Sequence, residues 1–323
     1  MRNILVTGGA GYIGSFMVKA LLDRGDKVVV FDNLKRGHIE AIDKRAQFVQ
    51  GDILNKSDLE SLLNSYSFDA ILHFAGLISV EESSRNPELY RENNIVGSAN
   101  LFDAVVSSGT KNLIFSSTAA VYGNPQKVPI PEDHSKNPAS PYGETKLATE
   151  EKLKSLRGTD ESINYAILRY FNACGAALDG SLGENHDPET HIIPLAIRAA
   201  KDNGEFKLYG TDYDTKDGTC IRDYIHVLDL VEAHILALEK IINDGGGHYY
   251  NVGTGKGFTN REIVEMVRKV SNKDFQIVEV ERRAGDSSEL VADVTKIKKE
   301  LGFNPKFSDL KTIIESAWKW HNK

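Results

Sequence analysis

The chain has 323 residues, a length that suits one large or two ordinary domains. Hydrophobic residues make up 41% and charged residues 26% of the sequence, as in globular proteins, and no apolar run is as long as a transmembrane helix, so we expect no membrane-embedded protein. The formal net charge of −7 argues against nucleic-acid binding as the main task, although a local arginine cluster can hold an anionic substrate.

Residues 3–22 predict a strand, a glycine-rich turn and a helix. An apolar run over residues 4–6 is typical of a buried strand, and the turn that follows contains Gly8, Gly11 and Gly14. Apolar residues then recur at the spacing of one helix face, and Gly25 is the expected C-cap. Glycines let the backbone approach a pyrophosphate, and a helix N-terminus attracts it. The alternative is a strand–turn–helix unit that needs its glycines only for packing.

A second expected strand, residues 27–31, leads to Asp32, which lies 18 residues after Gly14. At this distance a carboxylate is expected to bind the adenosine ribose of a dinucleotide, so the whole pattern favours dinucleotide binding over packing. Because Asp32 would repel a 2′-phosphate, we predict NAD rather than NADP. Lys35 and Arg36 follow closely and could support such a phosphate, which makes the prediction a real test.

The rest of the first half alternates strand and helix, which predicts an α/β fold with a doubly wound parallel sheet of Rossmann type. The expected strands are residues 28–31, 47–50, 70–74, 113–116 and 163–168, and the expected helices are residues 57–65, 94–107 and 142–156. Ligands bind such a sheet at the carboxyl ends of its strands, so the residues after each strand are candidates.

Three candidate sets follow the third and fourth strands. Asp52 and Ile53 could contact an adenine ring by hydrogen bond and packing, or form a plain turn. Small residues at 75–76 would let the backbone pass close to a cofactor. Asn93 and Asn94 open the next expected helix, where an N-cap explains them as well as a ligand contact does.

The fifth strand ends in residues 116–123, and a loop with five of the nine prolines follows. Proline stiffens a connection, and long loops in compact domains are usually functional. This loop delivers Tyr142 to the start of a helix, with Lys146 four residues on and on the same face. We expect the Lys146 ammonium to lower the pKa of Tyr142 so that Tyr142 accepts a proton from a substrate hydroxyl, with Thr118 sharing that proton or holding the substrate oxygen. An exposed helical pair is the alternative.

In the second half the alternation loosens, which suggests a smaller mixed α/β domain. We expect a cofactor domain over residues 1–172, rejoined by a segment around 222–255 whose strand at 248–252 returns to the main sheet, and a substrate domain mainly over residues 173–323. Arg222 and the pair Arg282 and Arg283 are candidates for gripping phosphates, or else ordinary surface arginines.

Cysteine and histidine usage predicts no disulfide framework and no metal. The two cysteines, Cys174 and Cys220, show neither the pattern of a disulfide framework nor the spacing of metal ligands. This favours a reducing cytoplasm. His186 and His191 have no ligand partners at a persuasive spacing. The first expected strand begins at residue 3, so we expect no signal peptide before it and a cytoplasmic protein.

Motifs along the chain resemble the extended short-chain dehydrogenase/reductase family. They are residues 7–14, 32–33, 52–53, 74–76 and 169–172, together with Tyr142 and Lys146. Within that family the chain resembles the UDP-glucose 4-epimerases nearly end to end, because the motifs at residues 222–227 and 282–286 match as well.

The resemblance implies a tightly held NAD that is not consumed and the interconversion of UDP-glucose and UDP-galactose. Tyr142 would take the proton of the sugar 4-hydroxyl while the 4-hydrogen leaves as hydride, and hydride would return to the opposite face of the 4-keto sugar. Thr118 would assist the proton transfer, and Lys146 would hold the nicotinamide ribose and tune Tyr142.

The resemblance also implies the contacts of each ligand by position. The cofactor set is Gly8, Gly11, Tyr12, Ile13, Gly14, Asp32, Asn33, Asp52, Ile53, Phe74, Ala75, Gly76, Asn94, Ser116, Tyr142, Lys146 and Tyr170. The substrate set is Thr118, Tyr142, Phe171, Asn172, His191, Ile192, Arg222, Arg283 and Asp286. His191 stands where some relatives have asparagine, and Ile78 where some have a lysine that touches the cofactor.

Leu290 stands, by the same resemblance, at the position that limits space beside the 2-substituent of the sugar. Since leucine is intermediate in size, we expect some turnover of the UDP-N-acetylhexosamines as well. The resemblance further implies a homodimer whose interface is formed by the helices at residues 94–107 and 142–156.

Related activities are the competing predictions. A nucleotide-sugar 4,6-dehydratase needs an additional acid–base pair, and relatives of that type resemble Thr-Asp-Glu where this chain has Thr118, Ala119 and Ala120. The presence of Arg222 and Arg283 does not distinguish an epimerase from a UDP-glucuronate decarboxylase. A non-catalytic NAD-sensing protein is disfavoured because the residues expected for catalysis are all present.

Overall fold

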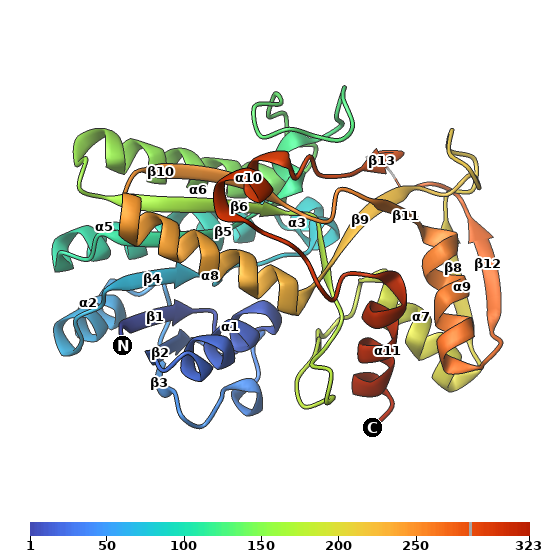
Figure 1. Ribbon diagram of the computed structural model, residues 1–323, viewed down its shortest axis with the longest axis horizontal. Coiled ribbons are helices and arrows are strands. Elements are labelled where there is room, and N and C mark those ends of the chain that lie inside the picture. The colour runs from blue at the N-terminus through green and yellow to red at the C-terminus, as the bar shows by residue number, and fades with distance from the viewer. Residues whose placement is uncertain (284–285) are drawn as a thin grey trace. The chain divides into compact units, whose positions relative to one another are not determined.

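The computed structural model describes residues 1–283 and 286–323, and these residues form two compact units (Figure 1). The first unit comprises Met1–Gly123, Lys136–Arg169 and Val231–Tyr250. The second comprises Asn124–Ser135, Tyr170–Leu230 and Asn251–Lys323. The chain therefore passes between the units several times, and the proline-rich loop contributes residues 124–135 to the second.

Within the described residues, the first unit is built on a seven-stranded sheet of order β10-β6-β5-β4-β1-β2-β3. The strands are β1 (Asn3–Thr7), β2 (Lys27–Asp32), β3 (Gln47–Gln50), β4 (Ala70–His73), β5 (Asn112–Thr118), β6 (Asn164–Tyr170) and β10 (Gly247–Val252). β1 pairs in parallel with β2 and β4, as β2 does with β3 and β4 with β5. The predicted doubly wound parallel sheet and the return of residues 248–252 to it are confirmed. The strand order switches between β1 and β4, because β2 and β3 lie on one side of β1 and the later strands lie on the other. Such sheets bind ligands at this switch point.

Helices cover both faces of this sheet (Figure 1). They are α1 (Tyr12–Asp23), α2 (Lys56–Ser65), α3 (Val80–Arg85), α4 (Pro87–Tyr90), α5 (Gly97–Ser108), α6 (Pro141–Thr159) and α8 (Val227–Asp244), with short turns η1 (Ile39–Ala41), η2 (Arg91–Val96) and η3 (Ala119–Tyr122). Alternate strand residues such as Leu5 and Ile71 pack with Leu62 of α2 and Phe102 of α5. The residues between them, such as Val6, are buried as well, since strand side chains alternate between the two faces. Both faces therefore bury apolar side chains, as a doubly wound sheet requires.

The helix expected to open at Asn94 begins earlier. Pro87 starts α4, and the backbone stays helical through Tyr90 and the π-helical turn η2 into α5. Asn93 and Asn94 thus lie inside a helical segment, and the N-cap interpretation is wrong because a cap must have non-helical backbone. The C-cap of α1 is Arg24 rather than the expected Gly25, which follows it with φ of +87°, a conformation that favours glycine.

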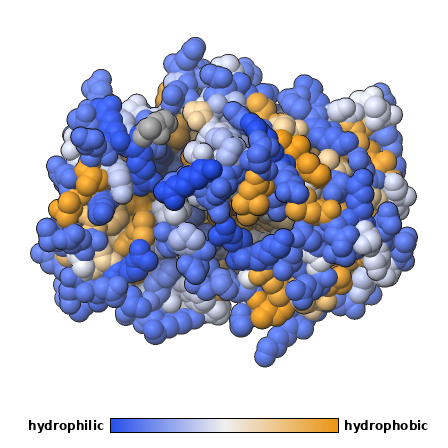
Figure 2. Space-filling view, turned by 180° about the vertical axis from the view of Figure 1, so that it is seen from behind, coloured by the Kyte–Doolittle hydropathy of each residue, from blue (hydrophilic) through white to orange (hydrophobic). Residues whose placement is uncertain are grey.

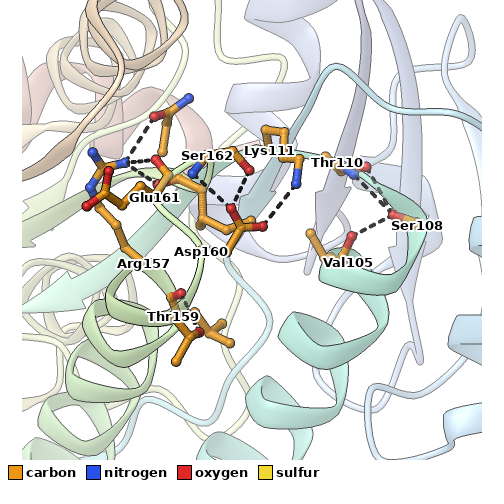
Figure 3. Close-up of polar contacts among 12 residues, drawn as sticks. Val105, Ser108, Thr110, Lys111, Arg157, Thr159, Asp160, Glu161 and Ser162 are labelled. Atoms are coloured by element: carbon orange, nitrogen blue, oxygen red, sulfur yellow. Dashed lines mark hydrogen bonds and ion pairs between the residues drawn. The ribbon is translucent and has the colours of Figure 1, made fainter.

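Hydrogen bonds and an ion pair stabilise the loops before β5 and β6, at the amino ends of these strands (Figure 3). The Asp160 carboxylate accepts hydrogen bonds from the Ser162 backbone and hydroxyl and from Lys111 Nζ at 3.1 Å. Arg157 Nη1 donates to the carbonyl oxygen of Ile163 at 2.5 Å. Since ligands bind at the opposite edge of the sheet, these contacts stabilise the fold rather than form a site.

The second unit is a mixed α/β structure, as predicted. Its strands are β7 (Asn172–Cys174), β8 (Glu205–Tyr209), β9 (Ile221–His226), β11 (Gly257–Thr259), β12 (Gln276–Val280) and β13 (Glu289–Leu290), and its helices are α7 (Ile192–Asp202), α9 (Asn260–Ser271), α10 (Thr295–Leu301) and α11 (Leu310–His321). β9 pairs with β7, β11 and β13, while β8 pairs with β12. Ile197, Val264 and Ile313 form its core between α7, α9 and α11.

The face drawn in Figure 2 is largely hydrophilic, with apolar patches between the polar residues. Over residues 1–283 and 286–323, no helix combines the length and the apolar character that crossing a membrane requires. Cys174 and Cys220 are both buried and neither forms a disulfide.

Candidate functional site

The glycine turn between β1 and α1 has no room for side chains at two positions. Gly8 has φ of +72°, and a Cβ there would lie 2.5 Å from the backbone nitrogen of Ala75. A Cβ on Gly14 would lie 2.2 Å from the carbonyl oxygen of Gly8. Gly11 is the N-cap of α1, and a glycine has no side chain that could bond the first backbone N–H groups of the helix. The turn therefore packs backbone on backbone and leads into a helix N-terminus, which is how phosphate-binding turns are built.

Asp32 ends β2 beside this turn and is almost completely buried. Its carboxylate accepts hydrogen bonds from the backbone N–H groups of Ala10 at 3.1 Å and Leu34 at 2.9 Å. Burial raises the pKa of Asp32, and the backbone hydrogen bonds oppose that change. The carboxylate is thus held in one orientation, as a ribose-binding acid needs to be.

Asp52 and Ile53 have different surroundings. Asp52 is partly exposed and accepts hydrogen bonds from Asn33 Nδ2 at 3.0 Å and from the Leu54 backbone at 3.0 Å, so it both builds the turn and faces the segment after β2. Ile53 is only 4% exposed and belongs to the core, where a Cβ on Gly97 would lie 2.7 Å from its side chain. The Ile53 side chain is thus mostly enclosed by the protein, and its contact with an adenine ring stays a prediction.

Three segments that are far apart in the sequence meet at Gly76. A Cβ at Gly76 would lie 3.3 Å from Asn94 Oδ1 and 3.6 Å from Lys146 Nζ. Asn94 accepts a hydrogen bond from the Leu77 backbone at 2.8 Å and donates one to the Leu77 carbonyl at 3.0 Å. Lys146 Nζ donates to the carbonyl oxygen of Ser116 at 2.7 Å. The structure thus brings together four of the predicted cofactor residues.

Tyr142 and Lys146 lie one turn apart at the start of α6, as predicted. Thr118, the last residue of β5, forms a side-chain hydrogen bond with Tyr142. Burial raises the pKa of Tyr142 to about 12, and the bond with Thr118 opposes this. Burial lowers the pKa of Lys146 to about 8. The expected lowering of the Tyr142 pKa is therefore not found, because desolvation outweighs it and the Lys146 ammonium is directed to Ser116 and the Phe115 ring.

A buried ion pair lies beside these residues. Arg169 and Glu150 have side chains that are 1% exposed, with Nη2 and Oε2 separated by 2.6 Å. Glu150 Oε1 also accepts from Arg169 Nε at 2.9 Å and from the Ser117 hydroxyl at 2.5 Å. Arg169 Nη1 donates to the Tyr122 hydroxyl at 2.9 Å. Glu150 and Ser117 were missed in the sequence, although Glu150 lies one helical turn after Lys146 and Ser117 precedes Thr118.

In the second unit, several predicted substrate residues lie on neighbouring strands. Arg222 of β9 is the register partner of Leu290 of β13, and its Nη2 atom lies 3.6 Å from Asp286 Oδ1. Asn172 of β7 donates a hydrogen bond from Nδ2 to the carbonyl oxygen of Asp223 at 3.0 Å. This sheet therefore gathers a cation, an amide and a carboxylate from three parts of the sequence.

Two arginines precede Asp286, and each lies over a tyrosine ring. Arg282 Cζ is 4.1 Å from the ring centroid of Tyr213, and Arg283 Cζ is 4.4 Å from that of Tyr209. Residues 284 and 285 of this motif lie outside the described residues. Both arginines are exposed, so they remain accessible to an anionic group.

Tyr170 and Phe171 follow the buried Arg169 at the end of β6. Tyr170 is 9% exposed, and Phe171 is partly buried and donates a backbone hydrogen bond to the Val252 carbonyl oxygen. Both belong to the second unit; Tyr170 thereby differs from the other residues of the predicted cofactor set, and Phe171 belongs to the predicted substrate set.

The segment before α7 gathers both histidines with two glutamates that sequence reasoning missed. His191 is the N-cap of α7, and its Nδ1 lies 2.9 Å from Glu184 Oε1 and 2.9 Å from Glu189 Oε1. His186 Nδ1 lies 3.0 Å from the same Glu184 oxygen. Burial alone would lower the pKa of His191, but the Glu184 carboxylate outweighs it and raises the pKa to about 10. The spacing Glu-x-His-x-x-Glu-x-His is the signal that could have found this cluster.

Comparison with known proteins identifies the family. Residues 4–253 match the model of the NAD dependent epimerase/dehydratase family. The chain is 47% identical over 323 residues to the UDP-glucose 4-epimerase of Rhizobium meliloti (strain 1021), covering 100% of this chain and 98% of that protein. It resembles the solved structure of the Brucella ovis UDP-glucose 4-epimerase in complex with NAD, with 45% identity, a TM-score of 0.94 and coverage of 98% and 97% of the two chains. The UDP-Glc/GlcNAc 4-epimerase of Campylobacter jejuni gives 39% identity, a TM-score of 0.88 and coverage of 100% and 99%. The chain belongs to the NAD dependent epimerase/dehydratase family.

Proposed function

We propose that this chain interconverts UDP-glucose and UDP-galactose by inverting the sugar at C4 through a 4-keto sugar, with NAD as its tightly bound cofactor. The observation that carries the proposal is Tyr142 hydrogen-bonded with Thr118, with Lys146 on the next turn of the same helix. Full-length similarity to proteins named UDP-glucose 4-epimerase supports it. The first unit binds the dinucleotide in this proposal, and the second mainly binds the UDP-sugar.

The residues of the first unit fit NAD. The glycine turn, which a Cβ would obstruct at Gly8 and Gly14, suits the pyrophosphate, and the Asp32 carboxylate suits the adenosine ribose hydroxyls. Lys146 suits the nicotinamide ribose, because its ammonium is buried next to Gly76 and Asn94. When bound, oxidised NAD supplies a hydride acceptor and a positively charged ring, which favours the phenolate form of a nearby tyrosine.

Tyr142 acts as general base in the proposed mechanism and takes the proton of the 4-hydroxyl. With a pKa of about 12, only about one Tyr142 in ten thousand is ionised at pH 8, so added positive charge is needed for this role. Thr118 holds the reacting oxygen through the hydroxyl that also contacts Tyr142. Tyr142 then returns the proton to the 4-oxygen of the inverted sugar, so no net proton is consumed.

The second unit supplies the proposed contacts to the UDP portion. Arg222 and Arg283 are suited to phosphate oxygens because a guanidinium group offers several donors in one plane. Asn172 and His191 add hydrogen-bonding groups at the start of β7 and α7. The full proposed substrate set is Thr118, Tyr142, Phe171, Asn172, His191, Ile192, Arg222, Arg283 and Asp286.

The test is to incubate the purified protein with UDP-galactose, and separately with UDP-glucose, without adding cofactor. We expect each sugar nucleotide to yield the other. A 4-keto-6-deoxy product from a nucleotide sugar would instead indicate a dehydratase, and release of CO₂ from UDP-glucuronate would indicate a decarboxylase. A dehydratase is disfavoured because Ala119 and Ala120, which follow Thr118 in η3, cannot transfer a proton. Absence of any conversion would favour the non-catalytic alternative.

Cofactor choice is a first testable consequence. Nucleotide extracted from the purified protein should be mostly NAD, because Asp32 repels a 2′-phosphate. The cations that follow are held elsewhere: Lys35 pairs with Asp52 at 3.0 Å and Arg36 with Glu82 at 2.6 Å. Recovery of mostly NADP would show that these two cations leave their carboxylates and outweigh Asp32.

Substrate breadth gives a second consequence, centred on Leu290. Leu290→Ser should raise kcat/KM for UDP-N-acetylgalactosamine relative to UDP-galactose, and Leu290→Tyr should lower it. Changes of a few methylenes in a pocket are worth about 1–3 kcal/mol, so we expect a shift of roughly tenfold rather than exclusion. Glu289→Gln is the matched control on the same strand. If both Leu290 variants keep the parental ratio, Leu290 is not the residue that selects the 2-substituent.

A homodimer is proposed as the working state. Among the described residues, four of the seven exposed large apolar side chains fall between residues 78 and 96, with Val80 at 50%, Leu89 at 44% and Val96 at 49% exposure. This segment leads directly into α5, one of the two helices expected at the interface. Exposed apolar residues that cluster in this way are typical of association surfaces. Light scattering should give twice the mass of one chain, and Val96→Asp should lower it.

A cytoplasmic location is part of the same proposal. The two cysteines are buried and not joined by a disulfide, which suits a reducing compartment. The net charge of −7 gives no reason to propose a nucleic-acid partner.

A further inference from the structure

The cluster of Glu184, His186, Glu189 and His191 has the donor atoms of a metal site. Each side chain directs one nitrogen or oxygen to a common centre, and these four atoms all lie within 4.8 Å of one another. Two are imidazole nitrogens and two are carboxylate oxygens, a donor set that suits zinc and similar divalent transition metals. All four residues come from one eight-residue stretch of the second unit.

The distances between the donors match a four-coordinate ion. Bonds of about 2.0–2.2 Å to zinc place neighbouring ligand atoms of a tetrahedron about 3.4 Å apart. His186 Nδ1 lies 3.0 Å from Glu184 Oε1 and 3.9 Å from Glu189 Oε2. His191 Nδ1 lies 2.9 Å from a carboxylate oxygen of each glutamate. The observed distances lie on both sides of the required value, so small side-chain movements would complete the coordination.

The burial of the carboxylates calls for positive charge at this centre. The side chain of Glu184 is 6% exposed and that of Glu189 is 10% exposed, and both face the same pair of imidazoles. Two carboxylates that are removed from water need about two compensating charges. One divalent cation can supply both from a single point. Such a cation accounts for all four donors at once, whereas hydrogen bonds between imidazole and carboxylate explain the contacts only in pairs.

Solvent access to the cluster and its place before α7 support a bound cation. A surface hollow of about 340 Å³ reaches His186 and Glu189 from solvent, which provides an entry path for an ion. Coordination through Nδ1 would leave the Nε2–H group of His191 available as a donor. A metal would also tie the irregular segment before α7 to the first turn of that helix, since His191 is the N-cap.

We propose that Glu184, His186, Glu189 and His191 bind one divalent transition-metal ion, of which zinc is the best match, and that this ion fixes the segment leading into α7. Its role is structural, and it orients a residue that the proposed function assigns to the substrate. Only that second part rests on the proposed function, because metal binding itself is measured without any sugar nucleotide.

The test is zinc binding to the full chain after chelator treatment, followed by calorimetric titration with zinc chloride and metal analysis of the dialysed protein. We expect about one zinc per chain. Glu184→Gln and His186→Ala should each weaken binding at least about a hundredfold, the upper end of what even an outer-shell partner contributes. Asp187→Asn is the matched control, since it removes a carboxylate from the same segment but not from the donor set, and it should bind zinc like the parent.

Cobalt chloride gives a second readout. A four-coordinate cobalt ion absorbs visible light strongly, so the parent and Asp187→Asn should develop this absorption and His186→Ala should not. If Glu184→Gln fails to fold, the partly exposed His186 still decides the question. Zinc stoichiometry well below one, or equal affinity in the parent, Glu184→Gln and His186→Ala, would overturn the proposal and leave hydrogen bonds between the imidazoles and the carboxylates as the explanation of the cluster.

Discussion

Tyr142→Phe is expected to lower the turnover of UDP-galactose at least about a hundredfold, the usual scale for loss of a general acid–base group. The change removes one hydroxyl and keeps the aromatic ring in its packed position at the start of α6. The lost group is the proposed proton acceptor, and the Thr118 hydroxyl that hydrogen-bonds with it is too weak an acid to replace a phenol in this role. Steady-state kinetics with both UDP-hexoses would measure the effect.

Two further measurements separate a chemical role of Tyr142 from a structural one. Bound NAD should still be recovered from Tyr142→Phe, because the glycine turn and Asp32 are unchanged. Tyr66→Phe is a suitable control, since Tyr66 ends α2 and stacks on Phe68 rather than on any proposed site residue. Near-normal turnover in Tyr142→Phe would refute the assigned role, whereas loss of bound NAD would point to a wider disturbance.

The local features of the first unit could be predicted from the sequence. Strand β3 has the expected bounds, and β1, β2 and β4 differ from expectation by a residue or two at their ends. These elements follow from apolar runs, glycine turns and helical spacing, all of which are local signals. The same signals placed Tyr142 and Lys146 on one helix face.

Features that depend on tertiary packing could not be predicted in this way. The helical backbone of Asn94 could not be predicted because η2, the turn that contains it, has no strong sequence signal, and its partner Leu77 is 17 residues away. The pKa of Tyr142 rises rather than falls because burial is a property of the folded chain. The packing of Ile53 into the core beside Gly97 was also not predictable, because spacing cannot tell a core residue from a residue at the surface.

Residues whose partners are distant were missed for the same reason. Glu150 and Arg169 are 19 residues apart and meet only because α6 packs beside β5 and β6. In the cluster before α7 the partners are close in sequence and their spacing is a signal, but an irregular segment has no period from which to infer which side chains converge. Short irregular stretches with several histidines and carboxylates therefore call for a structure.

The largest expected effect on stability comes from the buried pair of Arg169 and Glu150. Arg169→Met should lower the free energy of unfolding by about 3–5 kcal/mol, because it leaves the Glu150 carboxylate buried without its cation. The Ser117 hydroxyl would still donate to that carboxylate but carries no charge. Denaturant unfolding of the NAD-bound protein, monitored through the unfolding transition of the first unit, measures the loss of free energy of unfolding.

A double variant tests whether the effect comes from the uncompensated charge. Arg169→Met combined with Glu150→Leu removes both charges from the same buried space, so the loss should be smaller than in Arg169→Met alone. Asp23→Asn is the control for exposed pairs, since Asp23 and its partners Lys19 and Arg45 are 49%, 46% and 49% exposed, and it should cost no more than roughly 1 kcal/mol. Because Glu150 lies one turn after Lys146 and Ser117 lies next to Thr118, Arg169→Met should also reduce turnover by displacing the end of β5. An Arg169→Met variant as stable as the parent would show that Glu150 does not depend on Arg169 for its burial, and that the pair does not hold the catalytic strand end in place.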